Sequence, residues 1–255
     1  MKTAIITGAG RGIGKETAIL LAKNGINVVV CSRTRKEIDS LAEEINMMDK
    51  QYSPYHHPTD LQHKEILTKK KPEALAIKCD VGVSSQVNSL INSTLDKFGT
   101  VDILVNNAGV VFVKKLMHTS EEEWDQTISS NLKSAFLCTK AVLPHMLSNR
   151  SGAIINVSSG AGKVGFENLS VYCASKFGMM GLTASLADEV ANEKIRVMAI
   201  CPGEVATTMQ QDLDSRYYLL NKNKMLSPQE IAEKIVEMIL DDKNYQNGES
   251  VDIDK

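Results

Sequence analysis

Short apolar runs alternate with longer amphipathic stretches along the chain. The runs are rich in Val and Ile and mostly continuous, which is typical of strands buried on both faces of a parallel sheet. They lie at Thr3–Thr7, Asn27–Cys31, Leu75–Cys79, Ile103–Asn106, Ala153–Val157, Arg196–Ile200 and, more weakly, Glu249–Ile253. The stretches between them predict helices at Gly14–Asn24, Lys36–Ile45, Gln86–Phe98, Glu121–Leu147, Val171–Ala191 and Pro228–Leu240. Repeated βα units predict an α/β fold, a doubly wound parallel sheet with right-handed crossovers.

One connection is longer than this pattern requires. Between Ile45 and Ala74 the sequence is polar and holds three prolines and a run of three lysines. A plain helix-to-strand loop needs only about 2–6 residues. We therefore predict a single domain over residues 1–255 with an inserted polar segment at about 48–72. The insert joins a helix end to a strand start, so it belongs at the sheet edge opposite the one where ligands bind.

The insert also carries candidate metal ligands. His57, Asp60 and His63 are spaced three apart, with His56 adjacent, and could ligate an ion on one helical turn. Pro58 opposes a regular helix there. A solvated loop is the favoured interpretation, no metal is predicted, and a metal site or a partner-binding segment are the alternatives.

Composition and charge exclude several classes of partner. The net charge of -2 and a pI near 6.2 give no electrostatic reason to expect nucleic acid or an anionic membrane. The five cysteines are far apart and form no CxxC pair, which favours reduced thiols over disulfides or zinc. The first apolar run is too short for a signal peptide, and no run approaches 18 residues. We expect a cytoplasmic protein.

A glycine-rich loop, TGAGRGIG, follows the first predicted strand and opens a helix. Gly8 permits a tight turn, Gly12 allows the backbone to approach a pyrophosphate, and Gly14 allows close helix–strand packing. The phosphates would bind the free N–H groups at the helix start, around Ile13. An ordinary strand–helix turn is the alternative for such a loop alone, although its position after a buried strand favours a dinucleotide.

The end of the second strand indicates which dinucleotide. An NAD-binding chain would carry a carboxylate there for the ribose 2′-OH, whereas this chain has Ser32 followed by Arg33. A hydroxyl and a guanidinium suit a 2′-phosphate, and Arg11 in the glycine loop adds a second positive charge. The alternative is that Arg33 and Arg35 are solvated charges at a helix start. We predict NADP(H).

Tyr172 and Lys176 form the densest candidate for chemistry. They are four residues apart and would share one helix face, with their bases roughly 5–6 Å apart. A free phenol has a pKa of about 10, and a nearby ammonium stabilises the phenolate and lowers that pKa. Such a tyrosine can give a proton to a carbonyl oxygen or take one from an alcohol. Ser158 and Ser159 lie just upstream, and either hydroxyl could stabilise charge on that oxygen.

These motifs together resemble the short-chain dehydrogenase/reductase family over nearly the whole chain. The resemblance implies a Rossmann-type sheet of seven strands with helices on both faces, and it marks Arg11 and Arg33 as signs of NADP(H) use. Ser159 matches the family's catalytic serine because it lies 13 residues before Tyr172, which leaves Ser158 in support. Asn131 matches the asparagine that holds a proton-relaying water. Its alternative is a polar residue in a helix bend.

The resemblance also assigns further cofactor contacts. Asp80, followed by Val81, would accept a hydrogen bond from the adenine amino group, with a helix N-cap as the alternative. Asn107, Ala108 and Gly109 end the fourth strand and leave room for the adenine ribose. The nicotinamide would meet the turn that contains Pro202, Gly203, Val205 and Thr207.

The family spans many substrates, so several functions remain open. The first is NADPH-dependent reduction of a ketone to a secondary alcohol, with 3-oxoacyl-thioester reduction as the best match. The alternatives are a sugar, polyol, steroid or small diketone substrate, and a non-catalytic NADP(H) sensor. The segment Thr208–Leu226 would set the choice of substrate. The resemblance also implies a homodimer or homotetramer paired through the helices predicted at Glu121–Leu147 and Val171–Ala191.

Overall fold

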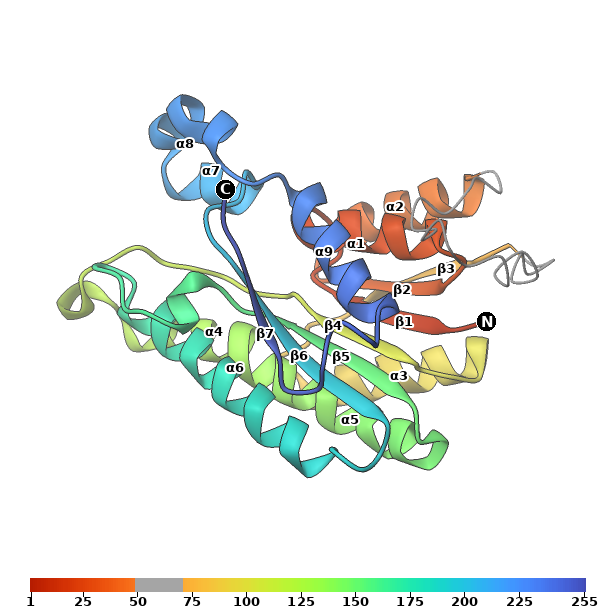
Figure 1. Ribbon diagram of the computed structural model, residues 1–255. Coiled ribbons are helices and arrows are strands. Elements are labelled where there is room, and N and C mark those ends of the chain that lie inside the picture. Colours follow the sequence, from red (N-terminus) through yellow and green to blue (C-terminus); the bar gives the residue numbers. More distant parts are fainter. Residues whose placement is uncertain (49–70) are drawn as a thin grey trace.

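The computed structural model describes residues 1–48 and 71–255 of the chain. Within them it has one parallel sheet of seven strands in the order β3-β2-β1-β4-β5-β6-β7 (Figure 1). The strands are β1 (Thr3–Thr7), β2 (Asn27–Ser32), β3 (Ala74–Lys78), β4 (Ile103–Asn106), β5 (Gly152–Val157), β6 (Ile195–Pro202) and β7 (Ser250–Ile253). The predicted doubly wound α/β fold is confirmed.

Helices cover both faces of the sheet (Figure 1). On one face α1 (Gly12–Lys23), α2 (Arg35–Met47) and α9 (Pro228–Leu240) pack against Ala4, Ile6, Val28 and Val30. On the other face α3 (Ser84–Phe98), α5 (Ser134–Asn149) and α6 (Ser170–Glu189) pack against Ile5, Val29 and Leu104. Successive strand residues thus enter opposite cores, which is why the strands read as continuous apolar runs.

The helix predicted over Glu121–Leu147 is divided into two. α4 (Glu121–Ile128) is followed by a π-helical turn at Ser129–Lys133, and α5 begins only at Ser134. Asn131 lies in this turn, and its side chain is bonded to the main chain of Val110 and to Ser175. These contacts hold the widened turn against α6 and the loop after β4. π-helical turns are frequent at functional sites.

The segment after β6 also contains more structure than was predicted. It forms two short helices, α7 (Thr208–Leu213) and α8 (Ser215–Asn221), which lie together near the C-terminus in Figure 1. Short 3-10 turns occur at Leu116–His118, Gly160–Gly162 and Lys222–Lys224. α9 begins as expected, with Ser227 and Glu230 in a capping box around Pro228.

A chain of buried amides crosses the centre of the sheet. Asn106 Nδ2 donates to Asn156 Oδ1 at 2.8 Å and to Thr139 Oγ1 at 3.1 Å. Asn156 Nδ2 in turn donates to Thr183 Oγ1 at 2.8 Å. Among the described residues the Asn106 Oδ1 atom has no hydrogen-bond partner. The network joins β4 and β5 to both α5 and α6.

The predicted insert falls almost wholly outside the described residues, as do His56, His57, Asp60 and His63. Its flanks agree with the sequence, because α2 ends at Met47 and β3 begins at Ala74. Over the part of the chain that is described, no helix has the length and apolar character needed to cross a membrane. The same residues contain no cluster of side chains suited to a metal ion.

Candidate active site

A single pocket brings together residues from distant parts of the sequence at the carboxyl ends of the strands. β1 lies between β2 and β4, so the crossovers on its two sides run in opposite directions and leave a crevice there. The cavity measures about 760 Å³. The predicted residues that line it are Gly8, Arg11, Gly12, Ile13, Ser32, Arg33, Asp80, Val81, Asn107, Ala108, Gly109, Ser159, Tyr172, Lys176, Pro202, Gly203, Val205 and Thr207. Gly14 and Asn131 are not among its lining residues.

The glycine loop is shaped for close approach of backbone. Gly8 and Gly12 have φ values of 63° and 58°, which L side chains rarely adopt. A β-carbon at Gly8 would lie 2.9 Å from the Ala108 Cα atom. α1 begins at Gly12 without a side-chain cap on its first N–H groups. The loop therefore fits a pyrophosphate, which those N–H groups would bind.

Gly14 packs closely against the start of the glycine loop. Asn107 Nδ2 donates to the carbonyl oxygens of Thr7 at 2.9 Å and Gly8 at 3.1 Å, which ties β4 to the start of the loop. A β-carbon at Gly14 would lie 2.6 Å from that Nδ2 atom and 2.7 Å from the Gly8 oxygen. Both neighbours are held by the backbone, so neither can move aside cheaply.

We expect Gly14→Ala to lower the free energy of unfolding by about 1–3 kcal/mol, the usual cost of overpacking a core. This expected loss is opposite in sign to the usual effect of replacing glycine by alanine within a helix, which raises the free energy of unfolding. Denaturant unfolding measures it. The matched control is Gly165→Ala, where an added β-carbon meets nothing within 4 Å and φ is not positive. Equal stability of the two variants would contradict the close packing.

Two arginines line the pocket. Arg11 and Arg33 are exposed, and among the described residues neither has an ion-pair partner. Arg35, by contrast, is paired with Asp39 at 2.7 Å. Ser32 Oγ accepts a hydrogen bond from the Thr34 N–H at 3.1 Å. Two guanidiniums and a hydroxyl at one end of the cavity fit a phosphate group.

Asp80 turns its carboxylate into the loop after β3. Its Oδ1 atom accepts a hydrogen bond from the Gly82 N–H at 2.9 Å, and the residue lines the cavity. The alternative role as a helix cap is wrong, because α3 begins at Ser84 with Val83 at its N-cap and no side-chain cap. The side chain is thus positioned by a local turn beside the glycine loop.

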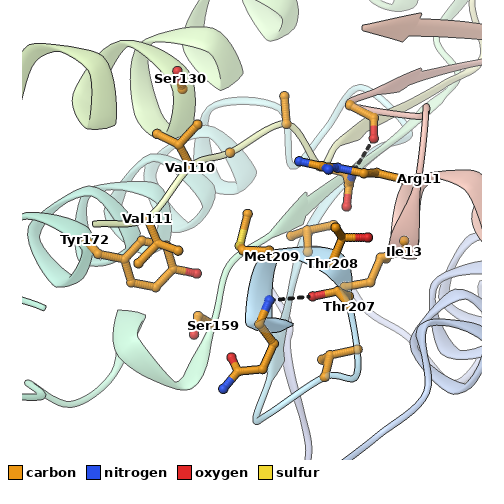
Figure 2. Close-up of a pocket in the computed structure, with 18 of the residues that line it drawn as sticks. Arg11, Ile13, Val110, Val111, Ser130, Ser159, Tyr172, Thr207, Thr208 and Met209 are labelled. Carbon is orange, nitrogen blue, oxygen red and sulfur yellow. Dashed lines mark hydrogen bonds between the residues drawn. The ribbon is translucent and has the colours of Figure 1, made fainter. Parts of the chain in front are cut away.

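Tyr172 and Ser159 lie near each other in the cavity. Figure 2 shows the Tyr172 hydroxyl directed into the pocket, with Ser159 below it and Arg11 on the opposite side. Burial raises the pKa of Tyr172 to about 12, and the nearby Ser159 hydroxyl acts in the lowering direction. The sequence had predicted a phenol pKa lowered by Lys176. In the structure burial outweighs any such effect.

Lys176 explains that difference. It is buried, and its Nζ atom donates to the Val157 carbonyl oxygen at 2.8 Å, with the centre of the Tyr172 ring 5.6 Å away. The ammonium is therefore directed to the backbone rather than to the phenol oxygen. Burial lowers the pKa of Lys176 to about 8. A bound, positively charged nicotinamide would act to lower the tyrosine pKa.

The two adjacent serines have different surroundings. Ser158 is buried, and its hydroxyl donates to the Lys176 carbonyl oxygen at 3.3 Å. Ser159 is half-buried, and its Oγ atom accepts from the Ala161 N–H at 3.1 Å. Of the two serines, only Ser159 acts on the pKa of Tyr172, in the lowering direction. This arrangement sets Ser159 towards the phenol and Ser158 towards the helix backbone.

Asn131 lies behind the cavity, where it links three elements. Its side chain accepts from the Val110 N–H at 2.8 Å and donates to the Val110 oxygen at 2.9 Å and to Ser175 Oγ at 3.0 Å. A β-carbon at Gly109 would lie 3.2 Å from its Oδ1 atom and 4.0 Å from Lys176 Nζ. Asn131 is thus near Lys176. It also lies in the π-helical turn, which agrees with the alternative prediction of a polar residue in a helix bend.

The sequence reasoning missed the apolar wall of the pocket. It contains Val110, Val111, Phe166, Leu169, Met209 and Leu213. These residues come from two separate loops and from α7, with no shared motif. Only the assignment of Thr208–Leu226 to substrate choice anticipated part of them. Tyr217 of α8 donates its hydroxyl to Glu204 Oε2 at 3.1 Å, which ties this wall to the turn after β6. Glu37, at the opposite end, was also missed.

The chain is similar to known proteins over nearly its whole length. The model of the short chain dehydrogenase family matches residues 2–66 and 57–217. The 3-oxoacyl-[acyl-carrier-protein] reductase FabG of Thermotoga maritima is 33% identical over 258 residues, which cover 99% of this chain and 96% of that protein. The 3-oxoacyl-[acyl-carrier-protein] reductase of Synechocystis is 35% identical over 256 residues, covering 99% and 95%.

A solved structure gives the same result. A short-chain type dehydrogenase/reductase from Mycobacterium marinum superposes with a TM-score of 0.85 at 29% identity, covering 99% of this chain and 94% of that one. The chain belongs to the short-chain dehydrogenase/reductase family. It is an oxidoreductase that acts on a CH–OH/C=O pair and uses a nicotinamide cofactor.

Proposed function

We propose that the protein is an NADPH-dependent 3-oxoacyl-thioester reductase, with Ser159, Tyr172, Lys176 and Asn131 as its catalytic residues. The observation that carries the proposal is that Ser159, Tyr172 and buried Lys176 line one pocket, with Lys176 Nζ 5.6 Å from the centre of the Tyr172 ring. The names of the two relatives supply the substrate class.

The chain's own residues would handle the proton. When bound, the nicotinamide supplies the hydride that joins the carbonyl carbon. Tyr172 would donate its phenolic proton to the carbonyl oxygen, which becomes the alcohol. Ser159 would donate a hydrogen bond to the same oxygen and stabilise its developing charge. Lys176, with Asn131 behind it, would return a proton to the phenolate.

The preference for the phosphorylated cofactor is also a proposal. Arg11, Ser32 and Arg33 would hold the 2′-phosphate, because two guanidiniums without ion-pair partners within the described chain line that end of the pocket. Asp80 and Val81 would meet the adenine, and Asn107, Ala108 and Gly109 the adjoining ribose. Gly8, Gly12, Ile13 and Gly14 would form the pyrophosphate site, and Pro202, Gly203, Val205 and Thr207 would meet the nicotinamide.

Assembly and location complete the proposal. Phe136 of α5 and Phe177 of α6 are each 45% exposed, which supports pairing of these helices in a homodimer or homotetramer, measurable by light scattering. All five cysteines are free, which supports a reducing compartment such as the cytoplasm.

The decisive experiment measures NADPH oxidation with acetoacetyl thioesters, small diketones and sugars, with NADH in parallel. We expect the highest kcat/KM with a 3-oxoacyl thioester and NADPH. Faster turnover of a sugar, polyol, steroid or diketone would contradict the substrate class. Equal or better rates with NADH would contradict the cofactor preference.

A further inference from the structure

Glu37 stands in a sequence that normally caps a helix. Thr34 and Glu37 have the spacing of a capping box at the start of α2. At the starts of α4 and α9, the same pattern forms both reciprocal hydrogen bonds. At α2 the Thr34 side chain makes no cap, and the Thr34 N–H donates to Ser32 Oγ instead. The Glu37 carboxylate is therefore not used at the helix start.

The carboxylate lies against the glycine loop instead. A β-carbon on Gly10 would collide with Glu37 Oε2 and would lie 3.0 Å from the Glu37 Cβ atom. Glu37 lines the same cavity as Arg11, Ser32 and Arg33. Within residues 1–48 and 71–255 its carboxylate has no hydrogen-bond or ion-pair partner.

We infer that Glu37 reduces discrimination between NADP(H) and NAD(H), as a carboxylate that lines the same cavity as the two arginines that would hold the 2′-phosphate. The inference rests on the cofactor proposed above. A carboxylate repels a phosphate monoester, which carries nearly two negative charges at neutral pH. It can still accept a hydrogen bond from a ribose 2′-OH. Glu37 thus lowers the affinity for the phosphorylated cofactor. It leaves the affinity for the unphosphorylated cofactor unchanged or raises it.

The test uses fragments that isolate the 2′ position, 2′,5′-ADP and 5′-AMP, measured by calorimetry on the whole protein. We expect Glu37→Gln to bind 2′,5′-ADP about 3–10-fold more tightly, the Coulomb effect of one charge at a solvated site. Its affinity for 5′-AMP should be unchanged or lower. The gain should shrink as salt is added, because ions screen the repulsion.

The matched control is Glu43→Gln, which removes the same charge from an exposed position of α2 outside the pocket. Glu37→Ala should reproduce the effect of Glu37→Gln. If Glu37→Gln changes the affinity ratio of the two fragments no more than Glu43→Gln does, or leaves 2′,5′-ADP unbound, the inference is overturned. Failure of the substrate proposal is separate, because it appears as lack of thioester reduction by the wild type, whatever the fragments show.

Discussion

Replacing Tyr172 with Phe should reduce kcat by about 100- to 10,000-fold, the usual contribution of a general acid. The ring fills the same space, so the half-buried side chain keeps its packing and loses only its hydroxyl. That hydroxyl is the group directed into the pocket beside Ser159 (Figure 2). Affinity for NADPH should change little. Steady-state kinetics and a fluorescence titration of NADPH measure the two quantities.

Tyr218→Phe is the appropriate control for this variant. Tyr218 lies on α8 next to Tyr217, but it is not part of the pocket lining. Loss of its hydroxyl should therefore leave turnover near that of the wild type. If the Tyr172→Phe variant retained more than about a tenth of the wild-type kcat, the proposal that the phenol is the proton donor would be contradicted.

Lys176→Met should change how stability depends on pH. Burial lowers the Lys176 pKa from 10.5 to about 8, which corresponds to about 3 kcal/mol against the charged form. Between pH 8 and 10.5 the unfolded chain holds the Lys176 proton and the folded protein does not. The free energy of unfolding of the wild type, relative to Lys176→Met, should therefore rise by about 3 kcal/mol across this window.

Urea unfolding at several pH values between 7 and 10.5 measures this difference. The comparison between the two proteins cancels the titrations that they share. One of these is the titration of Tyr172, whose raised pKa affects the free energy of unfolding only above about pH 10. Lys36→Met, at an exposed position of α2, controls for loss of a lysine in general. A constant difference between wild type and Lys176→Met across the window would show that Lys176 is not buried as described.

The sequence was most informative where one residue type satisfies one local requirement. Gly8 and Gly12 occupy positive φ, and the apolar strands enter two cores at once, so the glycine loop and the sheet could be predicted from spacing and periodicity. The pairing of Tyr172 with Lys176 followed from helical geometry. Each of these features depends on neighbours within a few residues.

Features that depend on distant contacts could not be predicted. The π-turn at Asn131 is held by Val110 and Ser175, which are 21 and 44 residues away in the chain. The raised pKa of Tyr172 depends on how deeply the pocket buries it, and the direction of Lys176 depends on a carbonyl of β5. Glu37 carried a capping pattern whose failure is visible only in three dimensions.

The amide chain through Asn106 and Asn156 has a consequence for how the protein opens. Their side-chain donors are satisfied only when α5 supplies Thr139 and α6 supplies Thr183. Detaching α5 would leave Asn106 Nδ2 with Asn156 alone, and detaching α6 would leave Asn156 Nδ2 without its Thr183 partner. A buried donor that loses its bond costs about 1–3 kcal/mol beyond the lost packing. Backbone protons of β4, β5, α5 and α6 should therefore exchange with solvent together, as one cooperative unit beneath the active site.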